Sequence, residues 1–174
     1  MVHELLRGGE LYDNLKRIPP LSEEKAAKII NELLNSIEYI HNLGILHRDL
    51  KPENIILREK GQLEDLVIAD FGLAEYYRKD GKYLFTRCGT PGYVAPEVLQ
   101  DKVYDFKVDV YSIGILLYIL IVGKSPFKWQ TYDDVVYLNY KGEIDYSDLK
   151  LSPEIVDLFK LMLEPNPLKR GSIE

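Results

Sequence analysis

The sequence of 174 residues is 46% hydrophobic and 29% charged, which is ordinary for one globular domain with a buried core. Its formal net charge of −6 argues against a general nucleic-acid binder, because such proteins are more often basic. Cys88 is the sole cysteine, so no intrachain disulfide is possible, and an intracellular, cytoplasmic location is the default expectation.

The first elements predicted along the chain are two helices. A short helical pattern through Leu11 and Leu15 is stopped by Pro19-Pro20. Ser22 then caps a long helix, which Gly44 ends. Apolar residues recur on one face of this second helix and predict a buried stripe: Ala26, Ile29, Ile30, Leu33, Ile37 and Ile40.

Two strands and three helices are predicted in the rest of the chain. Residues 55–57 and 66–69 are apolar and predict two strands joined by a polar hairpin loop, whereas 73–92 predicts irregular structure. The segment 107–122 is apolar nearly all round, as in a helix at a domain centre, and its longest apolar run is too short for membrane insertion. The predicted fold is mainly α with a small β element. The last two predicted helices lie near 131–140 and 153–163.

Three short motifs carry the chemistry. The run His47-Arg48-Asp49-Leu50-Lys51-Pro52-Glu53-Asn54 places a candidate base, a cation and a candidate metal ligand on one loop. Asp70-Phe71-Gly72 begins sixteen positions after Asn54, and Ala95-Pro96-Glu97 follows it. In this order and spacing, the motifs match the catalytic-loop, metal-loop and segment-end signature of protein kinases.

From residue 3 to residue 170 the chain resembles the C-terminal lobe of a eukaryotic-type serine/threonine protein kinase. The phrases Gly8-Gly9-Glu10-Leu11 and Cys88-Gly89-Thr90-Pro91-Gly92-Tyr93 make it most similar to the calcium/calmodulin-dependent group. The resemblance implies that 1–174 is a partial kinase catalytic domain, hinge and C-lobe only, truncated at both ends. The glycine-rich phosphate loop and the phosphate-anchoring lysine of the N-lobe do not occur in the sequence.

The resemblance implies ATP as the phosphate donor and Mg²⁺ as the metal. Asp49 matches the base that accepts the proton of a serine or threonine hydroxyl, and Lys51 matches the cation at the transferring phosphate. Asn54 and Asp70 match the metal ligands, and both offer the hard oxygens that Mg²⁺ prefers. With Lys51, they would also bind the nucleotide. A turn-capping role is the alternative for Asp49, but the full set of four residues disfavours it.

Other matches imply contacts with nucleotide and peptide. The Glu4 carbonyl and the Leu6 amide align with the hinge that holds adenine, and Ile56 aligns with the apolar floor under the base. Glu10 resembles the acid that meets ribose and a basic residue N-terminal to the phosphoacceptor, and Glu53 would add to that subsite. Protein substrates with basic motifs are therefore expected. The alternative for Glu10 is that it only favours the start of a helix.

Three residues match regulatory positions. Arg48 resembles the arginine that pairs with a phosphate on the activation segment, and its expected partner is Thr86, phosphorylated by an upstream kinase. Thr90 resembles the threonine that bonds to the catalytic aspartate and lysine. The alternatives are a solvated loop threonine for Thr86 and ordinary turn packing for Thr90.

The remaining matches concern architecture. Glu97 and Arg170 resemble a buried ion pair that ties the end of the activation segment to the lobe. Asp109 resembles the acid that anchors the backbone of the catalytic loop, and it needs hydrogen-bond partners in an otherwise apolar helix. His47 and Phe71 resemble two stacked members of the regulatory core.

Two classes of function remain open. One is a serine/threonine protein kinase of which this chain is a part, and the other is a noncatalytic lobe that binds proteins. The intact catalytic residues favour the first, and the missing N-lobe motifs favour the second. The chain alone is expected to have little activity, because losing one group that stabilises the transition state often costs about 10²–10³ in rate. Association is expected through the face that an N-lobe would cover: Leu5, Leu6, Ile56 and Phe71.

Overall fold

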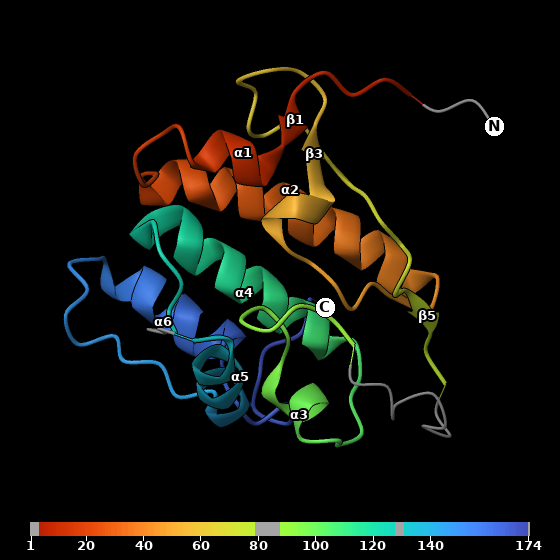
Figure 1. Cartoon of the computed structure of the whole chain (residues 1–174), viewed down its shortest axis with the longest axis vertical. Helices are drawn as coiled ribbons and strands as arrows, with labels where there is room; N and C mark the ends of the chain where they lie inside the picture. The colour runs from red at the N-terminus through yellow and green to blue at the C-terminus, as the bar shows by residue number, and fades with distance from the viewer. Residues whose placement is uncertain (1–3, 79–87, 128–130, 174) are drawn as a thin grey trace.

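The computed structural model describes residues 4–78, 88–127 and 131–173. Figure 1 shows helix α4 between the long helix α2 on one side and α6 on the other, with the small strands β1 and β3 at one end of the domain and helices α3 and α5 at the opposite end. The described elements run in this order: β1 Gly9–Glu10, α1 Leu11–Leu15, α2 Glu23–Asn42, β2 Ile45–Leu46, the 3₁₀ turn η1 Pro52–Asn54, β3 Ile55–Leu57, β4 Leu66–Ile68, β5 Glu75–Tyr76, α3 Pro96–Leu99, α4 Lys107–Val122, α5 Tyr132–Lys141 and α6 Pro153–Met162.

Helix α2 forms where the sequence predicts it. The Ser22 hydroxyl caps its first turn by accepting a hydrogen bond from the Lys25 amide. All six residues of the predicted apolar stripe are buried, and the helix packs mainly against α4. Each fully buried leucine or isoleucine contributes roughly 1.5–3 kcal/mol relative to an exposed one, so this stripe is a main source of the lobe's stability.

Helix α4 is the centre of the domain, as its apolar sequence predicts, and nearly all of its residues are buried. Gly114 permits the close packing of α6, because a Cβ at this position would lie 2.8 Å from Leu163 and 2.9 Å from Met162. Gly123 ends the helix in a left-handed conformation. No helix in the described part of the chain is long and apolar enough to cross a membrane.

Tyr111 of α4 is fully buried, and its side chain carries a polar hydroxyl group into the core. Its ring lies 4.9 Å below the Arg170 guanidinium. Its hydroxyl faces the Asn139 side chain without a hydrogen bond of ordinary geometry to any described residue. Burial raises the pKa of this phenol. The hydroxyl therefore costs desolvation without an equivalent bond in return.

We expect Tyr111→Phe to raise the free energy of unfolding by about 1 kcal/mol, since the change removes an unsatisfied buried hydroxyl. Urea unfolding followed by circular dichroism measures this difference. The matched control is Tyr104→Phe, which removes a hydroxyl that accepts a 3.0 Å hydrogen bond from Arg48 Nη1 and should lower stability. A loss of stability in Tyr111→Phe would show that its hydroxyl is satisfied.

The strands form two small antiparallel sheets. β3 and β4 make the predicted hairpin, although β4 ends at Ile68, one residue earlier than predicted, and β1 adds a third strand with Glu10 opposite Ile56. β2 pairs with β5, which corrects the expectation of irregular structure at residues 75–76. Each of these two strands has two residues, which is too short to show an alternating pattern in the sequence.

Candidate active site

The loop of residues 47–54 leaves β2 and enters β3 through η1. Asp109 of α4 fixes the start of this loop. Its fully buried carboxylate accepts hydrogen bonds from the backbone amides of His47 and Arg48, both at 2.9 Å, and lies 2.8 Å from His41 Nε2. A buried carboxylate is costly without such partners. The core helix therefore determines where the loop lies.

Two residues of the site have left-handed backbone conformations, which non-glycine residues adopt at a cost of roughly 1–2 kcal/mol. Arg48 has φ 69° and Asp70 has φ 59°. The Arg48 side chain is held by Nε, which donates a 2.7 Å hydrogen bond to the Leu73 carbonyl. The Asp70 carboxylate accepts a 3.0 Å bond from the Gly72 amide. Conformations of this kind cluster at functional sites, where surrounding contacts enforce them.

Asp49, Lys51 and Thr90 form a closed triangle of polar contacts. Lys51 Nζ lies 3.0 Å from Asp49 Oδ2 and donates a 2.8 Å hydrogen bond to Thr90 Oγ1. Thr90 Oγ1 in turn donates to Asp49 Oδ1 at 2.8 Å. The structure thus brings the segment around residue 90 to the catalytic loop and orients the carboxylate between a cation and a hydroxyl.

Asn54 and Asp70 lie at the same end of the β3–β4 hairpin, because the Ala69 amide donates to the Asn54 carbonyl at 2.8 Å. Asn54 Nδ2 donates to the Asp49 backbone oxygen at 2.9 Å and to its Oδ2 at 3.1 Å. This orientation leaves Asn54 Oδ1 as the oxygen that a ligand could use. Asp70 is exposed beside it.

This pair of oxygen donors fits Mg²⁺, which proteins usually bind through one or two side chains together with substrate phosphates and water. A metal site whose ligands all come from the protein would need three or more such side chains close together. No group of three or more His, Cys, Asp or Glu side chains that could hold a metal ion occurs among the residues that the structure describes. The donor set therefore suits a metal ion that arrives with a phosphate ligand.

The residues expected at the nucleotide lie along β3. Leu6 and Ile56 are half-buried, and backbone hydrogen bonds from the two residues after Leu6 carry this segment alongside the strand. The Glu4 carboxylate forms an ion pair with Arg58 Nη1 on the surface. By this antiparallel register the backbone of residues 4–6 lies beside Arg58, at the end of β3 that is farther from the loop of residues 47–54.

Glu10 and Glu53 lie on elements that pack against each other, β1 and η1. Glu10 is exposed and makes no side-chain cap at the start of α1. Glu53 Oε2 is buried and has no hydrogen-bond partner among the described residues. Burial raises the pKa of the nearby Tyr93 phenol, and the charge of Glu53 raises it further. A buried carboxylate oxygen without a donor is a favourable place for a cation.

Arg48 is already engaged on two sides, since its guanidinium contacts the Leu73 carbonyl and the Tyr104 hydroxyl. Thr86, its expected phosphorylated partner, lies outside the described residues, so this pairing stays a prediction. His47 is fully buried, and its ring meets Phe71 edge-on, with centroids 5.0 Å apart at 65°. The expectation of a stacked pair is corrected, because aromatic rings of this kind favour edge-to-face contacts.

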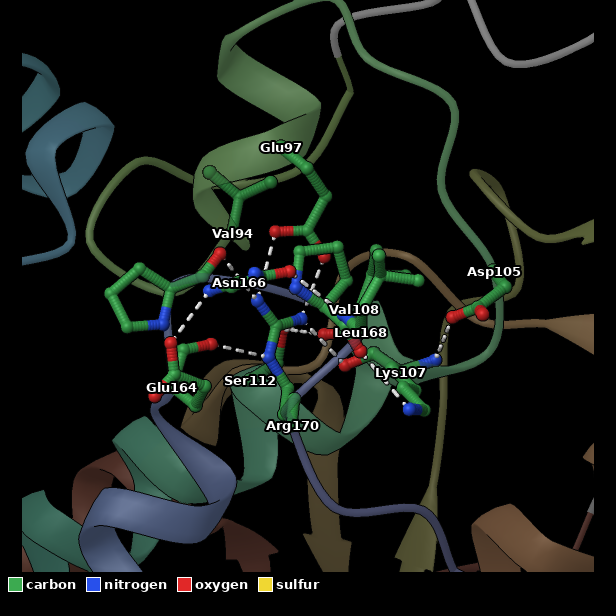
Figure 2. A network of polar contacts seen from close by, with 12 residues as sticks. Val94, Glu97, Asp105, Lys107, Val108, Ser112, Glu164, Asn166, Leu168 and Arg170 are labelled. Atoms are coloured by element: carbon green, nitrogen blue, oxygen red, sulfur yellow. Dashed lines mark hydrogen bonds and ion pairs between the residues drawn. The ribbon is translucent and has the colours of Figure 1, made fainter.

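Glu97 and Arg170 form a fully buried ion pair with two bonds. Arg170 Nη1 donates to Glu97 Oε1 at 2.6 Å, and Nη2 donates to Oε2 at 2.9 Å. Figure 2 shows that the guanidinium also reaches the chain around Glu164 and Lys107, whose carbonyls accept 2.9 and 3.0 Å bonds. One side chain thereby joins α3, the start of α4 and the segment after α6.

Asn139 of α5 is a buried polar residue that was not predicted from the sequence. This residue is fully buried, and its amide group bonds to Gly92 and Val94 in the segment after Thr90. An asparagine on a helix with several charged residues is usually solvated. Its signal in the sequence was its place on the same helical face as Val135 and Leu138.

The family described as "Protein kinase domain" matches residues 1–174. The chain therefore belongs to the protein kinase domain family.

Several curated relatives are similar over almost the whole chain. A probable myosin light chain kinase of Dictyostelium discoideum is 41% identical over 100% of this chain and 55% of its own length. CBL-interacting protein kinase 1 of Oryza sativa subsp. japonica is 39% identical over 99% of this chain and 37% of its own length. CBL-interacting serine/threonine-protein kinase 20 of Arabidopsis thaliana is 43% identical over 98% of this chain and 38% of its own length. The chain thus spans about half or less of the length of these relatives.

Proposed function

We propose that the protein transfers the γ-phosphate of ATP to serine or threonine hydroxyls of protein substrates. In this proposal residues 1–174 are the hinge and C-lobe of the kinase, most like the calcium/calmodulin-dependent group. The observation that carries it is the triangle of Asp49, Lys51 and Thr90 beside two further ligand side chains, Asn54 and Asp70. A binding module has no need of this combination.

The chemistry assigns a task to each residue. As the acceptor oxygen bonds to the γ-phosphorus and the bond to the β-phosphate oxygen breaks, the hydroxyl proton passes to Asp49. Thr90 and Asn54 donate to opposite oxygens of that carboxylate and fix its plane. Lys51 supplies positive charge at the transferring group. Mg²⁺, held by Asn54 and Asp70, would neutralise charge on the phosphate oxygens.

The isolated 174 residues should transfer phosphate poorly. They contain neither a glycine-rich loop over the phosphates nor a lysine on a preceding strand. Leu5 is 76% exposed and Phe71 is 47% exposed, on the face that those elements would cover. We infer that this face associates with an N-lobe or, in its absence, with other apolar surfaces.

The test is a phosphotransfer assay with radiolabelled ATP and a serine peptide, made on the native protein and on the purified 174-residue chain. Activity of the native protein with a background rate for the chain supports the proposal. Activity of neither favours the alternative, a noncatalytic lobe that binds proteins. The mass of the endogenous protein separates these cases further, since 20.1 kDa is the mass of this chain alone.

Substrates with arginine N-terminal to the phosphoacceptor fit the two acids near the loop. We expect the pair of changes Glu10→Gln and Glu53→Gln to lower kcat/KM for such a peptide by about a hundredfold or more, since each charge-assisted bond contributes roughly 1.5–3 kcal/mol. A peptide with alanine in place of the arginine should be unaffected. The matched control is the exposed Glu59→Gln. Equal losses of kcat/KM with both peptides would show that Glu10 and Glu53 do not bind the basic residue of the substrate.

Phosphorylation of Thr86 by an upstream kinase belongs to the same proposal, in a cytoplasmic setting. Arg48 would be the partner of the phosphate, which adds about −1.5 to −2 charges at neutral pH. Mass spectrometry of the endogenous protein decides whether Thr86 carries phosphate when the enzyme is active. An active enzyme that is unmodified at this residue would remove Thr86 from the mechanism.

A further inference from the structure

The buried Asn139 side chain holds the segment that carries Thr90. Asn139 Oδ1 accepts a 2.7 Å hydrogen bond from the Gly92 amide, and Nδ2 donates a 2.8 Å bond to the Val94 carbonyl. One amide thus satisfies a backbone donor and a backbone acceptor two residues apart. Because the site is buried, loss of this side chain would leave both backbone groups without a partner.

The segment is a tight turn that transmits this constraint to Thr90. The Thr90 carbonyl accepts bonds from the Tyr93 amide at 3.0 Å and the Val94 amide at 3.2 Å, so the two ends of the turn are joined. Gly89 has φ 98°, and a Cβ there would lie 2.7 Å from the Arg48 carbonyl. The turn is therefore packed against the catalytic loop on one side and bonded to α5 on the other.

Helix α5 is a well-defined support for this contact. Thr131 and Asp134 form a reciprocal capping box at its start, and Gly142 ends it in a left-handed conformation. A polar side chain in this buried position is favourable only when both of its bonds form. The two directional bonds of Asn139 therefore fix one position of the turn relative to α5. An apolar residue at this position would make no such bonds and would allow several positions of the turn.

We propose that Asn139 is a positioning residue for the phosphoacceptor side of the active site. It acts through the turn of residues 90–94, which keeps Thr90 in contact with Asp49 and Lys51. The inference rests on the proposed kinase function. Asn54 and Asp70, the candidate metal ligands, make none of these bonds, so the nucleotide side should be independent of Asn139.

The first experiment needs no activity. Amide hydrogen exchange of the full 174-residue chain is measured by NMR for the wild type and for Asn139→Leu, Asn139→Asp and Ile155→Val. The last is a core control on α6, away from the turn. In Asn139→Leu the Gly92 amide should exchange about tenfold faster or more, because it loses its acceptor. Asn139→Asp retains an acceptor and should keep Gly92 protected. Equal exchange of the Gly92 amide in Asn139→Leu and in the core control would overturn the proposal.

The second experiment uses the active native kinase with the same changes. Asn139→Leu should raise KM for a serine peptide about fivefold or more while KM for ATP stays within about twofold, since the lost contacts lie on the acceptor side. Asn139→Asp should recover part of the peptide affinity. A parallel rise of both KM values would overturn the positioning role. If the native protein has no activity, the proposed function fails, and the exchange experiment still decides whether Asn139 holds the turn.

Discussion

Replacing Arg170 with methionine should lower the free energy of unfolding by about 3–5 kcal/mol, the usual cost of leaving a buried charge without its partner. Glu97 would remain in the core without the two hydrogen bonds that now neutralise it (Figure 2). A small domain has only about 5–15 kcal/mol of stability in total, so this one change should remove a large part of it. Urea unfolding at neutral pH gives the value.

The double variant Glu97→Met with Arg170→Met separates charge from packing. It should recover part of the loss, because no buried charge is left unpaired. Recovery should be incomplete, since the carbonyls of Glu164 and Lys107 would still lack the donors that Arg170 provides. An exposed ion pair, Lys28 with Glu24 on α2, is the control, and its removal should change stability by less than about 1 kcal/mol. A loss below that value for Arg170→Met would contradict the assignment of a structural ion pair.

Asp49→Asn should lower kcat of the active kinase by about 10²–10⁴, the range that a positioned general base contributes. The amide is close in shape to the carboxylate and can still accept a bond from Thr90, but it cannot take up the proton of the acceptor hydroxyl. KM for ATP should change little, whereas the melting temperature should fall modestly, because the new amide nitrogen replaces the oxygen that faces Lys51 and Asn54. Steady-state kinetics and thermal unfolding of the same preparation measure both effects.

The control for this change is Asp65→Asn, an exposed acid paired with Arg58 away from the loop, which should retain full activity. If Asp49→Asn kept most of its activity, Asp49 would be only a structural member of the triangle with Lys51 and Thr90. That result would also count against the proposed kinase function and favour the alternative, a noncatalytic lobe that binds proteins.

Elements with a long, regular pattern could be predicted from the sequence. The stripe of α2 with its Ser22 cap, and the apolar run of α4, define their helices to within a residue. The start of α5 was predicted one residue early, because Thr131 caps the helix and does not belong to it. The catalytic-loop residues were selected by their motif, and the structure places Asp49, Lys51 and Asn54 within bonding distance.

Contacts between residues far apart in the chain could not be predicted, because they produce no regular pattern in the sequence. Ser152, the cap of α6, donates through its amide and hydroxyl to the Glu23 carboxylate at 2.8 and 2.6 Å, across 129 positions. These bonds lower the pKa of Glu23. The bonds of Asn139 and the pairing of β2 with β5 likewise depend on which segments the fold brings together. Periodicity could indicate that Asn139 lies on a buried helical face, but neither residue type nor periodicity could indicate which segments these groups bond to.

The all-round apolar surface of α4 has a consequence for synthesis on the ribosome. One face can dock on α2 as soon as α4 emerges, because α2 precedes it in the chain. The face around Gly114 has to wait for α6, whose last residue follows roughly 40 positions later, or about 2–8 s at ordinary elongation rates. During that interval the nascent chain exposes an apolar ridge. Chaperone binding to a stalled nascent chain that ends between α4 and α6 should therefore exceed binding to one that includes α6.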